Sequence, residues 1–191
     1  MTEYKSILEE SIRIRETMMS DLELQQTLSR VVDEIERCFR AGGKLLLCGN
    51  GGSASDAQHI AAELSGRFVK DREPLFAEAL HVNTSFLTAV ANDYGYEEVF
   101  SRMVRAMGRE GDVLIGLSTS GNSPNVVRAF EAARDRSMLT VLMTGNDAGD
   151  TGSFAHHILK VPSANTARIQ EIHITLGHMI CGEIEDRIFE T

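Results

Sequence analysis

The sequence predicts an α/β protein in which a mainly parallel, five-stranded sheet is covered by helices on both faces. Two observations support this fold class. Short apolar runs alternate with longer stretches in which apolar residues recur at helical spacing. The short runs are followed by turns rich in Gly, Ser, Thr or Asn, and a helical stretch then leads to the next run. Such strand–helix–strand alternation places successive strands in parallel, with the connecting helices packed on the sheet.

The elements can be placed in order along the chain. Helical spacing extends from Tyr4 to Arg40 in two pieces, either Ser20 or Asp21 can cap the second piece, and Ala41-Gly42-Gly43 ends it. Five strands are predicted over residues 44–48, 78–82, 112–117, 139–143 and 157–161. Helices are predicted from the glycine turn to residue 65, from 84 to a loop at 92–95, and over 97–107, 124–136 and 167–189. Because the composition shows no break, we expect one domain over residues 1–191, with residues 1–40 as an N-terminal helical extension.

The composition limits the classes of partner. Hydrophobic residues make up 42% of the chain, charged residues 25%, and the net charge is −9. This acidic balance argues against broad binding to a nucleic-acid backbone, which needs clustered Lys and Arg. It permits a small anionic ligand, because a few backbone N–H groups can bind a phosphate on an acidic protein.

The cysteines and the N-terminus indicate the compartment. Cys38, Cys48 and Cys181 are widely spaced and form no CxxC pair, which is typical of buried thiols in a reducing compartment. The N-terminus has no apolar signal core, and no apolar run approaches the ~18 residues of a membrane span. We therefore expect a cytoplasmic protein with no membrane association and no nucleic-acid partner. The first helix has no strand to cover, and its apolar stripe predicts contacts with other subunits.

A hydroxyl-rich loop, Ser118-Thr119-Ser120-Gly121-Asn122-Ser123, follows the third predicted strand, and Pro124 is well placed to begin a helix. In parallel sheets ligands bind beyond the carboxyl ends of the strands. Four hydroxyl groups at a helix N-terminus can hold a phosphate dianion without Lys or Arg. A helix cap alone would need only one hydroxyl, so this loop favours binding.

Two further loops are weaker candidates. Gly49-Asn50-Gly51-Gly52-Ser53 lies between a strand and a helix, where glycine lets the backbone approach a ligand, although a tight turn would use the same residues. It matches neither a Walker loop nor a dinucleotide fingerprint. Asn92-Asp93 before Tyr94-Gly95 is an ordinary turn sequence that could also bind the hydroxyl groups of a polyol.

Titratable side chains on two helices could carry chemistry. His59 and Glu63 are four residues apart and therefore share a helix face, as metal ligands, as an acid/base pair, or as a solvated pair. On the last helix, His178 falls on one side with both Gln170 and Glu171, so spacing alone does not choose its partner. A lone His among apolar neighbours is also commonly a satisfied core residue.

Taken together, these elements resemble the sugar isomerase (SIS) domain family, and within it the bacterial phosphoheptose isomerases. The matching stretches are Cys48 to Phe68, Ala89 to Tyr96, Gly108 to Val126, and Ala167 to His178, and the likeness covers nearly the whole chain. The resemblance implies a three-layer αβα sandwich and a homotetramer with active sites between subunits. It also implies conversion of D-sedoheptulose 7-phosphate to D-glycero-D-manno-heptose 7-phosphate, a step towards ADP-heptose and lipopolysaccharide.

The resemblance assigns roles by matching motifs. It implies a zinc ion, one per subunit, held by His59, Glu63, Gln170 and His178, so that Gln170 rather than Glu171 is the functional partner on the last helix. Glu63 and His178 also match the acid/base pair. The implied sugar and phosphate contacts are Asn50, Gly51, Gly52, Ser53, Glu63, Asn92, Asp93, Ser118, Thr119, Ser120, Ser123 and Gln170. The chain has Ala167 where some members carry an acid, which removes any accessory role for a carboxylate there.

We therefore expect ketose–aldose isomerisation through an enediol, with Glu63 transferring the C–H proton and His178 serving the oxygens. Two rival functions belong to other classes. One is a non-enzymatic tetramer of this fold that binds the replication initiator, and the other is a module that senses phosphosugars. The presence of both Glu63 and His178 favours the enzyme.

Overall fold

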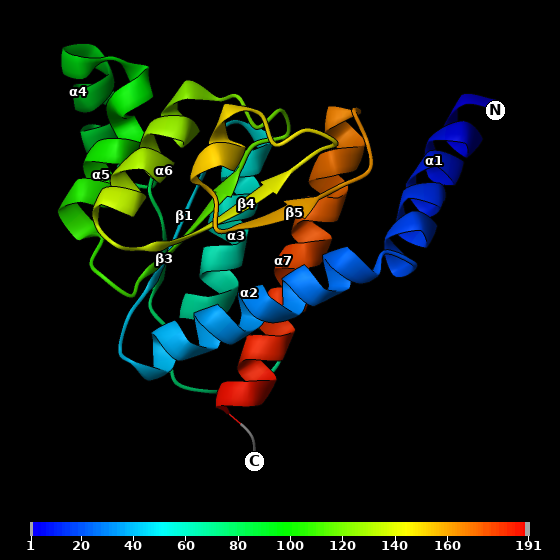
Figure 1. Cartoon of the computed structure of the whole chain (residues 1–191), viewed down its shortest axis with the longest axis horizontal. Helices are drawn as coiled ribbons and strands as arrows, with labels where there is room; N and C mark the ends of the chain where they lie inside the picture. Colours follow the sequence, from blue (N-terminus) through cyan, green and yellow to red (C-terminus); the bar gives the residue numbers. More distant parts are fainter. Residues whose placement is uncertain (1, 190–191) are drawn as a thin grey trace.

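Five parallel strands form the centre of the protein, in the order β2-β1-β3-β4-β5 (Figure 1). The computed structural model describes residues 2–189. The strands are β1 (Leu45–Gly49), β2 (Ala77–Ala79), β3 (Val113–Leu117), β4 (Leu139–Thr144) and β5 (His157–Lys160). The mainly parallel sheet between helices that the sequence predicts is confirmed.

Helices cover both faces of this sheet (Figure 1). They are α1 (Thr2–Met19), α2 (Leu22–Arg40), α3 (Gly52–Ser65), α4 (Thr84–Tyr94), α5 (Val99–Met107), α6 (Pro124–Asp135) and α7 (Thr166–Ile188), with short 3₁₀ helices η1 (Tyr96–Glu98) and η2 (Asp150–Phe154). Successive strand residues point to opposite faces. Leu45 and Leu47 accordingly join the core with α2, α3 and α7, while Leu46 and Cys48 join the core with α5 and α6.

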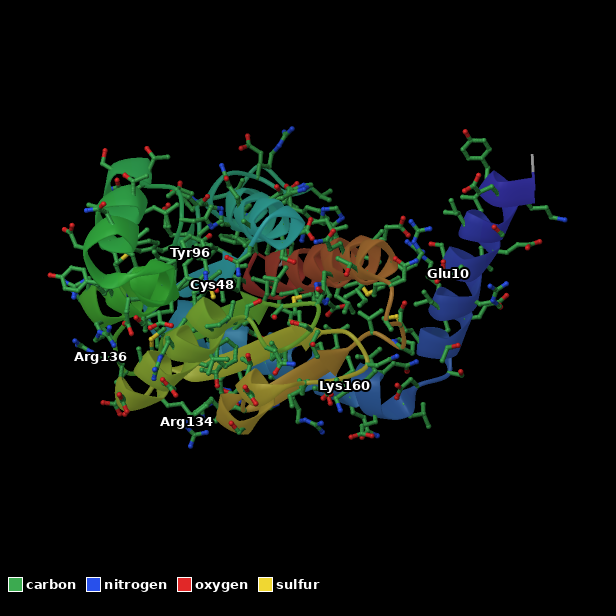
Figure 2. The ribbon with its side chains drawn as sticks, turned by 90° about the horizontal axis from the view of Figure 1, so that it is seen from above. Glu10, Cys48, Tyr96, Arg134, Arg136 and Lys160 are labelled. Carbon is green, nitrogen blue, oxygen red and sulfur yellow. The ribbon has the colours of Figure 1, made fainter. Side chains whose placement is uncertain are left out.

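The N-terminal extension consists of two helices, as predicted. Asp21 caps α2, because its side chain accepts a hydrogen bond from the Leu24 N–H at 3.0 Å. The first helix, which carries Glu10, stands apart from the sheet and its covering helices (Figure 2). Its second half contacts the core through Ile14 and Met18, and its Ser11 hydroxyl donates to Glu171 at 3.0 Å. Among residues 2–189, no helix is long and apolar enough to cross a membrane.

The larger differences from the predicted elements lie around α4 and before β5. The predicted strand over 78–82 occupies only Ala77–Ala79, because the chain turns after Leu80 and Asn83 already caps α4 through the Phe86 N–H. Residues 92–94 belong to the last turn of α4 rather than to a loop, and this helix ends at Gly95, whose φ is +94°. The short helix η2 was not predicted from the sequence.

The sheet brings two sequence-distant loops together at its carboxyl edge. Strands β1 and β3 are neighbours in register, with Gly49 opposite Leu117. The loop after Gly49 therefore begins beside the loop after Leu117. This edge is where ligands bind in parallel α/β sheets.

Candidate active site

Three side chains that can carry a proton or hold a metal ion meet on the outer side of α3 and α7. His59 Nε2 lies 3.0 Å from Glu63 Oε1, and His178 Nε2 lies 3.5 Å from His59 Nε2. The three ligand atoms all lie within 4.8 Å of one another. The pair on α3 is local, since residues four apart share a helix face, whereas His178 arrives by the packing of α7 on α3.

A glycine on α7, Gly177, allows α7 and α3 to pack closely beside the cluster. At Gly177, next to His178, an added Cβ would lie 2.5 Å from Cδ1 of Ile60, next to His59. The two helices can approach only because residue 177 has no side chain. The cluster is partly open, with the His59 side chain 49% exposed and that of Glu63 22% exposed.

The loop after α3 borders the cluster on one side. The Phe68 ring lies 5.6 Å from the His178 imidazole. Its segment is fixed by Glu185 of α7, whose carboxylate accepts from the Val69 and Lys70 N–H groups at 2.9 and 2.6 Å and from Arg72 Nε at 3.0 Å. Arg72 in turn donates to the backbone carbonyl of Glu63 at 2.8 Å. The end of α3 and the loop beside His178 are therefore held by one buried network.

Asp56 was not predicted and lies one turn before His59 on α3. Its Oδ2 atom is buried and has no hydrogen-bond partner among the described residues. Burial raises the pKa of the Asp56 carboxyl, while the nearby His59 and His178 act in the opposite direction. The spacing of three residues between Asp56 and His59 is the signal that could have identified it.

The glycine loop places backbone and amide groups at the carboxyl edge. Gly51 adopts φ +57°, a left-handed conformation that favours glycine, and α3 begins at Gly52. A Cβ at Gly52 would lie 2.7 Å from Nε2 of Gln170, so the Gln170 amide packs against the start of α3. Ser53 is 4% exposed.

Gln170 therefore packs at the start of α3, whereas His59 lies further along the same helix. The seven residues from Gly52 to His59 correspond to about 10 Å along the axis of α3. The predicted zinc ligand Gln170 is thus beside the glycine loop, and its role as a ligand stays a prediction.

The hydroxyl loop forms the neighbouring part of this edge. Ser118 is 3% exposed, and its hydroxyl donates to Ser123 Oγ at 3.2 Å. Ser120 Oγ accepts from the Asn122 N–H at 3.2 Å. Ser123 is the residue before α6, yet its side chain makes no cap hydrogen bond. Hydroxyl groups and the N-terminus of α6 are therefore gathered where an anion is favoured, and Thr119 lies within the same loop.

The predicted sugar contacts Asn92 and Asp93 lie on the exposed end of α4. Their side chains bond to each other, Asn92 Nδ2 donating to Asp93 Oδ1 at 2.8 Å. No contact places them against the other candidate residues within the described part of the subunit, and their substrate role stays a prediction.

An amide network that was not predicted joins the two loops. Asn50 of the glycine loop and Asn125 of α6 exchange two hydrogen bonds of 2.9 Å, and the Tyr96 hydroxyl donates to Asn50 Oδ1 at 3.1 Å. These residues border an open hollow of about 430 Å³ at the carboxyl edge. Nothing in the local sequence marks Asn125 or Tyr96, because they meet Asn50 only in the folded chain.

The donor set on α3 and α7 suits a transition-metal ion. His59 and His178 offer imidazole nitrogens and Glu63 offers a carboxylate oxygen, the ligand types of three-ligand zinc sites that keep one position open. The same three groups also suit proton transfer.

The fold and these two regions define a class: an α/β protein with hydroxyl groups and a helix N-terminus gathered at the carboxyl edge of its sheet, and a separate cluster of residue types suited to acid/base or metal chemistry. Comparison with known proteins makes this specific. The family model for the SIS domain matches residues 8–145, and the chain belongs to this family.

Its relatives agree with this assignment. Phosphoheptose isomerase of Burkholderia pseudomallei is 49% identical over 99% of this chain and 96% of the relative's length. That of Aneurinibacillus thermoaerophilus is 46% identical over 99% and 96%. The solved phosphoheptose isomerase of Neisseria gonorrhoeae matches with a TM-score of 0.90 and 44% identity over 97% of this chain and 98% of that one.

Proposed function

We propose that this chain converts D-sedoheptulose 7-phosphate to D-glycero-D-manno-heptose 7-phosphate. The chain is an isomerase, like the phosphoheptose isomerases that it matches over nearly its full length. The observation that carries the proposal is the contact of His59, Glu63 and His178, which supplies groups for proton transfer in addition to the hydroxyl loop proposed to bind the phosphate.

The reaction moves a hydrogen from C1 of the ketose to C2 and exchanges the protons of the two oxygens. Glu63 removes the C1 proton and returns it at C2 of the enediol, because a carboxylate is an acceptor that becomes a donor once protonated. His178 serves the oxygens, since a neutral imidazole offers one donor and one acceptor nitrogen.

The remaining candidate residues hold the substrate. Ser118, Thr119, Ser120 and Ser123 bind the phosphate through their hydroxyl groups and the first N–H groups of α6. The sugar is bound by the glycine-loop residues Asn50, Gly51, Gly52 and Ser53. The side chains of Asn92, Asp93 and Gln170 also bind it.

A zinc ion, one per subunit, is part of the proposal. His59, Glu63 and His178 would hold it, and a bound Zn²⁺ would polarise the substrate oxygens as a Lewis acid. Gln170 is proposed as the fourth ligand. Because its amide packs on Gly52, it can reach the cluster only by leaving that position or by coming from another subunit.

The test is incubation of the purified protein with sedoheptulose 7-phosphate, with and without chelator, while aldose formation is followed by NMR. We expect turnover by the untreated protein, and absence of product under both conditions would contradict the function. Loss only with chelator would make the metal catalytic. His59→Gln should also lower the zinc content measured by mass spectrometry.

A matched pair of variants tests the role of Glu63. Glu63→Gln keeps the size of the side chain but cannot accept the proton, so kcat should fall by about 100-fold or more. Glu73→Gln changes an exposed carboxylate in the loop after α3 and should leave kcat unchanged. Near-normal turnover of Glu63→Gln with an intact fold would show that another group is the base.

A homotetramer with sites between subunits is also proposed. Apolar side chains on and just after α1 are exposed in the single chain, which supports burial by other copies. They are Tyr4, Ile7, Leu8, Ile12, Met19 and Leu22. Replacing both Leu8 and Ile12 by Asp should dissociate the assembly in analytical ultracentrifugation and lower activity. A tetramer unchanged by this double substitution would place the contact elsewhere.

The non-enzymatic alternatives are not favoured. The sugar isomerase domain of an RpiR transcription factor from Sphaerobacter thermophilus shares only the fold with this chain, at 16% identity. A cytoplasmic location is proposed as well, supported by three buried free thiols that suit a reducing compartment.

A further inference from the structure

The amide of Asn50 is held by two other side chains, and this arrangement restricts what it can do to a ligand. Asn125 Nδ2 and the Tyr96 hydroxyl both donate to Asn50 Oδ1, at 2.9 and 3.1 Å. An amide oxygen has two lone pairs, so its acceptor capacity is filled. Asn50 Nδ2 donates one hydrogen to Asn125 Oδ1 at 2.9 Å, and its second N–H has no acceptor among residues 2–189. Asn50 can therefore offer a ligand only a donor.

The residue that fixes this orientation is buried and belongs to the other loop. Asn125 is 2% exposed and is the second residue of α6, directly after Ser123 and Pro124. Asn50 is only half-buried and lies between β1 and α3. The reciprocal pair thus links the end of the hydroxyl loop (residues 118–123, the phosphate loop) to the glycine loop (residues 49–53, the sugar loop) across the neighbouring strands β1 and β3.

We propose that Asn125 is a positioning residue that, with Tyr96, holds Asn50 as a fixed N–H donor to a carbonyl or hydroxyl oxygen of an open-chain sugar phosphate. This inference rests on the proposed function for the identity of the substrate. It adds that the phosphate loop and the sugar loop act as one unit, because a ligand that orders the start of α6 also orders the Asn50 amide.

Two variants change this network in different ways. Asn125→Leu keeps about the same side-chain size and adds no charge beside the hydroxyl loop, but it removes both hydrogen bonds to Asn50, so that the Asn50 amide loses its fixed orientation. Tyr96→Phe removes the second donor only, and because Tyr96 is 54% exposed this variant should fold normally. Tyr94→Phe is the matched control, since Tyr94 is 55% exposed and its ring contacts Arg102 rather than Asn50.

The experiment compares two ligands by calorimetry, sedoheptulose 7-phosphate and inorganic phosphate, together with kcat/KM. For Asn125→Leu we expect sugar phosphate affinity and kcat/KM to fall by about 10-fold or more, the size of one lost hydrogen bond from the Asn50 amide to the sugar. Tyr96→Phe should cause a loss of about 3-fold, from one hydrogen bond in an exposed position. Phosphate affinity should change by less than about 2-fold in both variants, and Tyr94→Phe should match the wild type.

The outcomes separate the two proposals. Equal losses for both ligands would show that Asn125 only supports the hydroxyl loop, and unchanged sugar affinity in Asn125→Leu and Tyr96→Phe would also overturn the inference. If the wild type binds the sugar phosphate but does not convert it, the proposed function fails, and the ratio of the two affinities still decides the role of Asn125. A wild type that binds phosphate but not this sugar phosphate would overturn both.

Discussion

Glu185 and Arg72 form an ion pair in which both side chains are almost completely buried. Glu185 Oε2 lies 3.0 Å from Arg72 Nε, and the two side chains are 2% and 3% exposed. Burial alone would raise the pKa of Glu185, but hydrogen bonds from the Lys70 and Val69 N–H groups and from Arg72 outweigh it and lower this pKa. The pair therefore stays charged and holds the loop beside His178.

Removing one charge from this pair should be costly. Glu185→Gln leaves the Arg72 guanidinium buried without its counter-ion, and we expect the free energy of unfolding to fall by about 3 kcal/mol or more. Urea denaturation measures this loss. Glu183→Gln, on the same helix and 61% exposed, should change stability by less than about 1 kcal/mol. Similar values for the two variants would mean that the buried pair contributes little.

The two glycines of α7 should respond oppositely to alanine. At Gly177 a Cβ would lie 2.5 Å from Ile60, so Gly177→Ala must separate α7 from α3 and should destabilise by about 1–3 kcal/mol. It should also lower kcat, because the separated helices carry His59 and His178. At Gly182 the nearest atom is Phe68 Cε1 at 3.5 Å, an ordinary contact, and Gly182→Ala should stabilise by up to about 1 kcal/mol. Thermal unfolding and initial rates of the two variants test the contrast, and equal behaviour would contradict it.

His173 should make stability depend on pH. It is completely buried on α7, and burial lowers its pKa from 6.5 to about 4, while its hydrogen bond to the Thr144 carbonyl acts in the opposite direction. The unfolded chain therefore binds a proton at a higher pH than the folded chain does. This contribution to stability is complete above pH 6.5 and is lost as the pH falls towards 4.

Between pH 7 and pH 5 the loss from this group should be about 2 kcal/mol. Urea unfolding at both pH values, compared with His173→Leu, isolates the contribution of this imidazole from those of the other histidines. The variant should lose less stability than the wild type over this range. Identical losses in the two proteins would show that His173 does not titrate as its burial requires.

Ser137 ends α6 in a conformation that favours glycine. Its φ is +55°, and the Met138 N–H bonds to the Ala133 carbonyl, as in a glycine-terminated helix. Ser137→Gly should therefore raise the free energy of unfolding by about 0.5–1 kcal/mol. Ser137→Ala has a Cβ like serine and should change stability by less than about 0.5 kcal/mol. Calorimetry of both variants checks the difference, and a destabilised Ser137→Gly would contradict the explanation.

The sequence predicts those features that depend on local pattern. Asp21 is a helix cap, and His59 and Glu63 share a face because they lie four residues apart on one helix. The predicted end of β2 was wrong because the apolar residues Leu80 and Val82 continue the pattern, whereas the chain turns there and Asn83 caps α4. Hydropathy does not distinguish a strand from a buried turn.

Features that depend on tertiary contacts had no local signal. Asn125 meets Asn50 across 75 residues, and Arg72 meets Glu185 across 113. His178 joins His59 only because Gly177 allows α7 to pack closely on α3. Resemblance to a family predicts His178 as a site residue, but the contacts that position it required the folded chain.

The three buried thiols can report local unfolding of the protein. Burial raises the pKa of Cys38 to about 11 and those of Cys48 and Cys181 to about 12, and none is more than 5% exposed. In the native state thiol reagents should therefore find almost no reactive thiolate. Cys38 lies on α2, Cys48 on the inner strand β1 and Cys181 on α7. The alkylation rate of each thiol therefore measures how often the structure around it opens to solvent. Mass spectrometry of alkylated peptides can thus follow local unfolding of the helical layer and of the sheet separately, without an engineered cysteine.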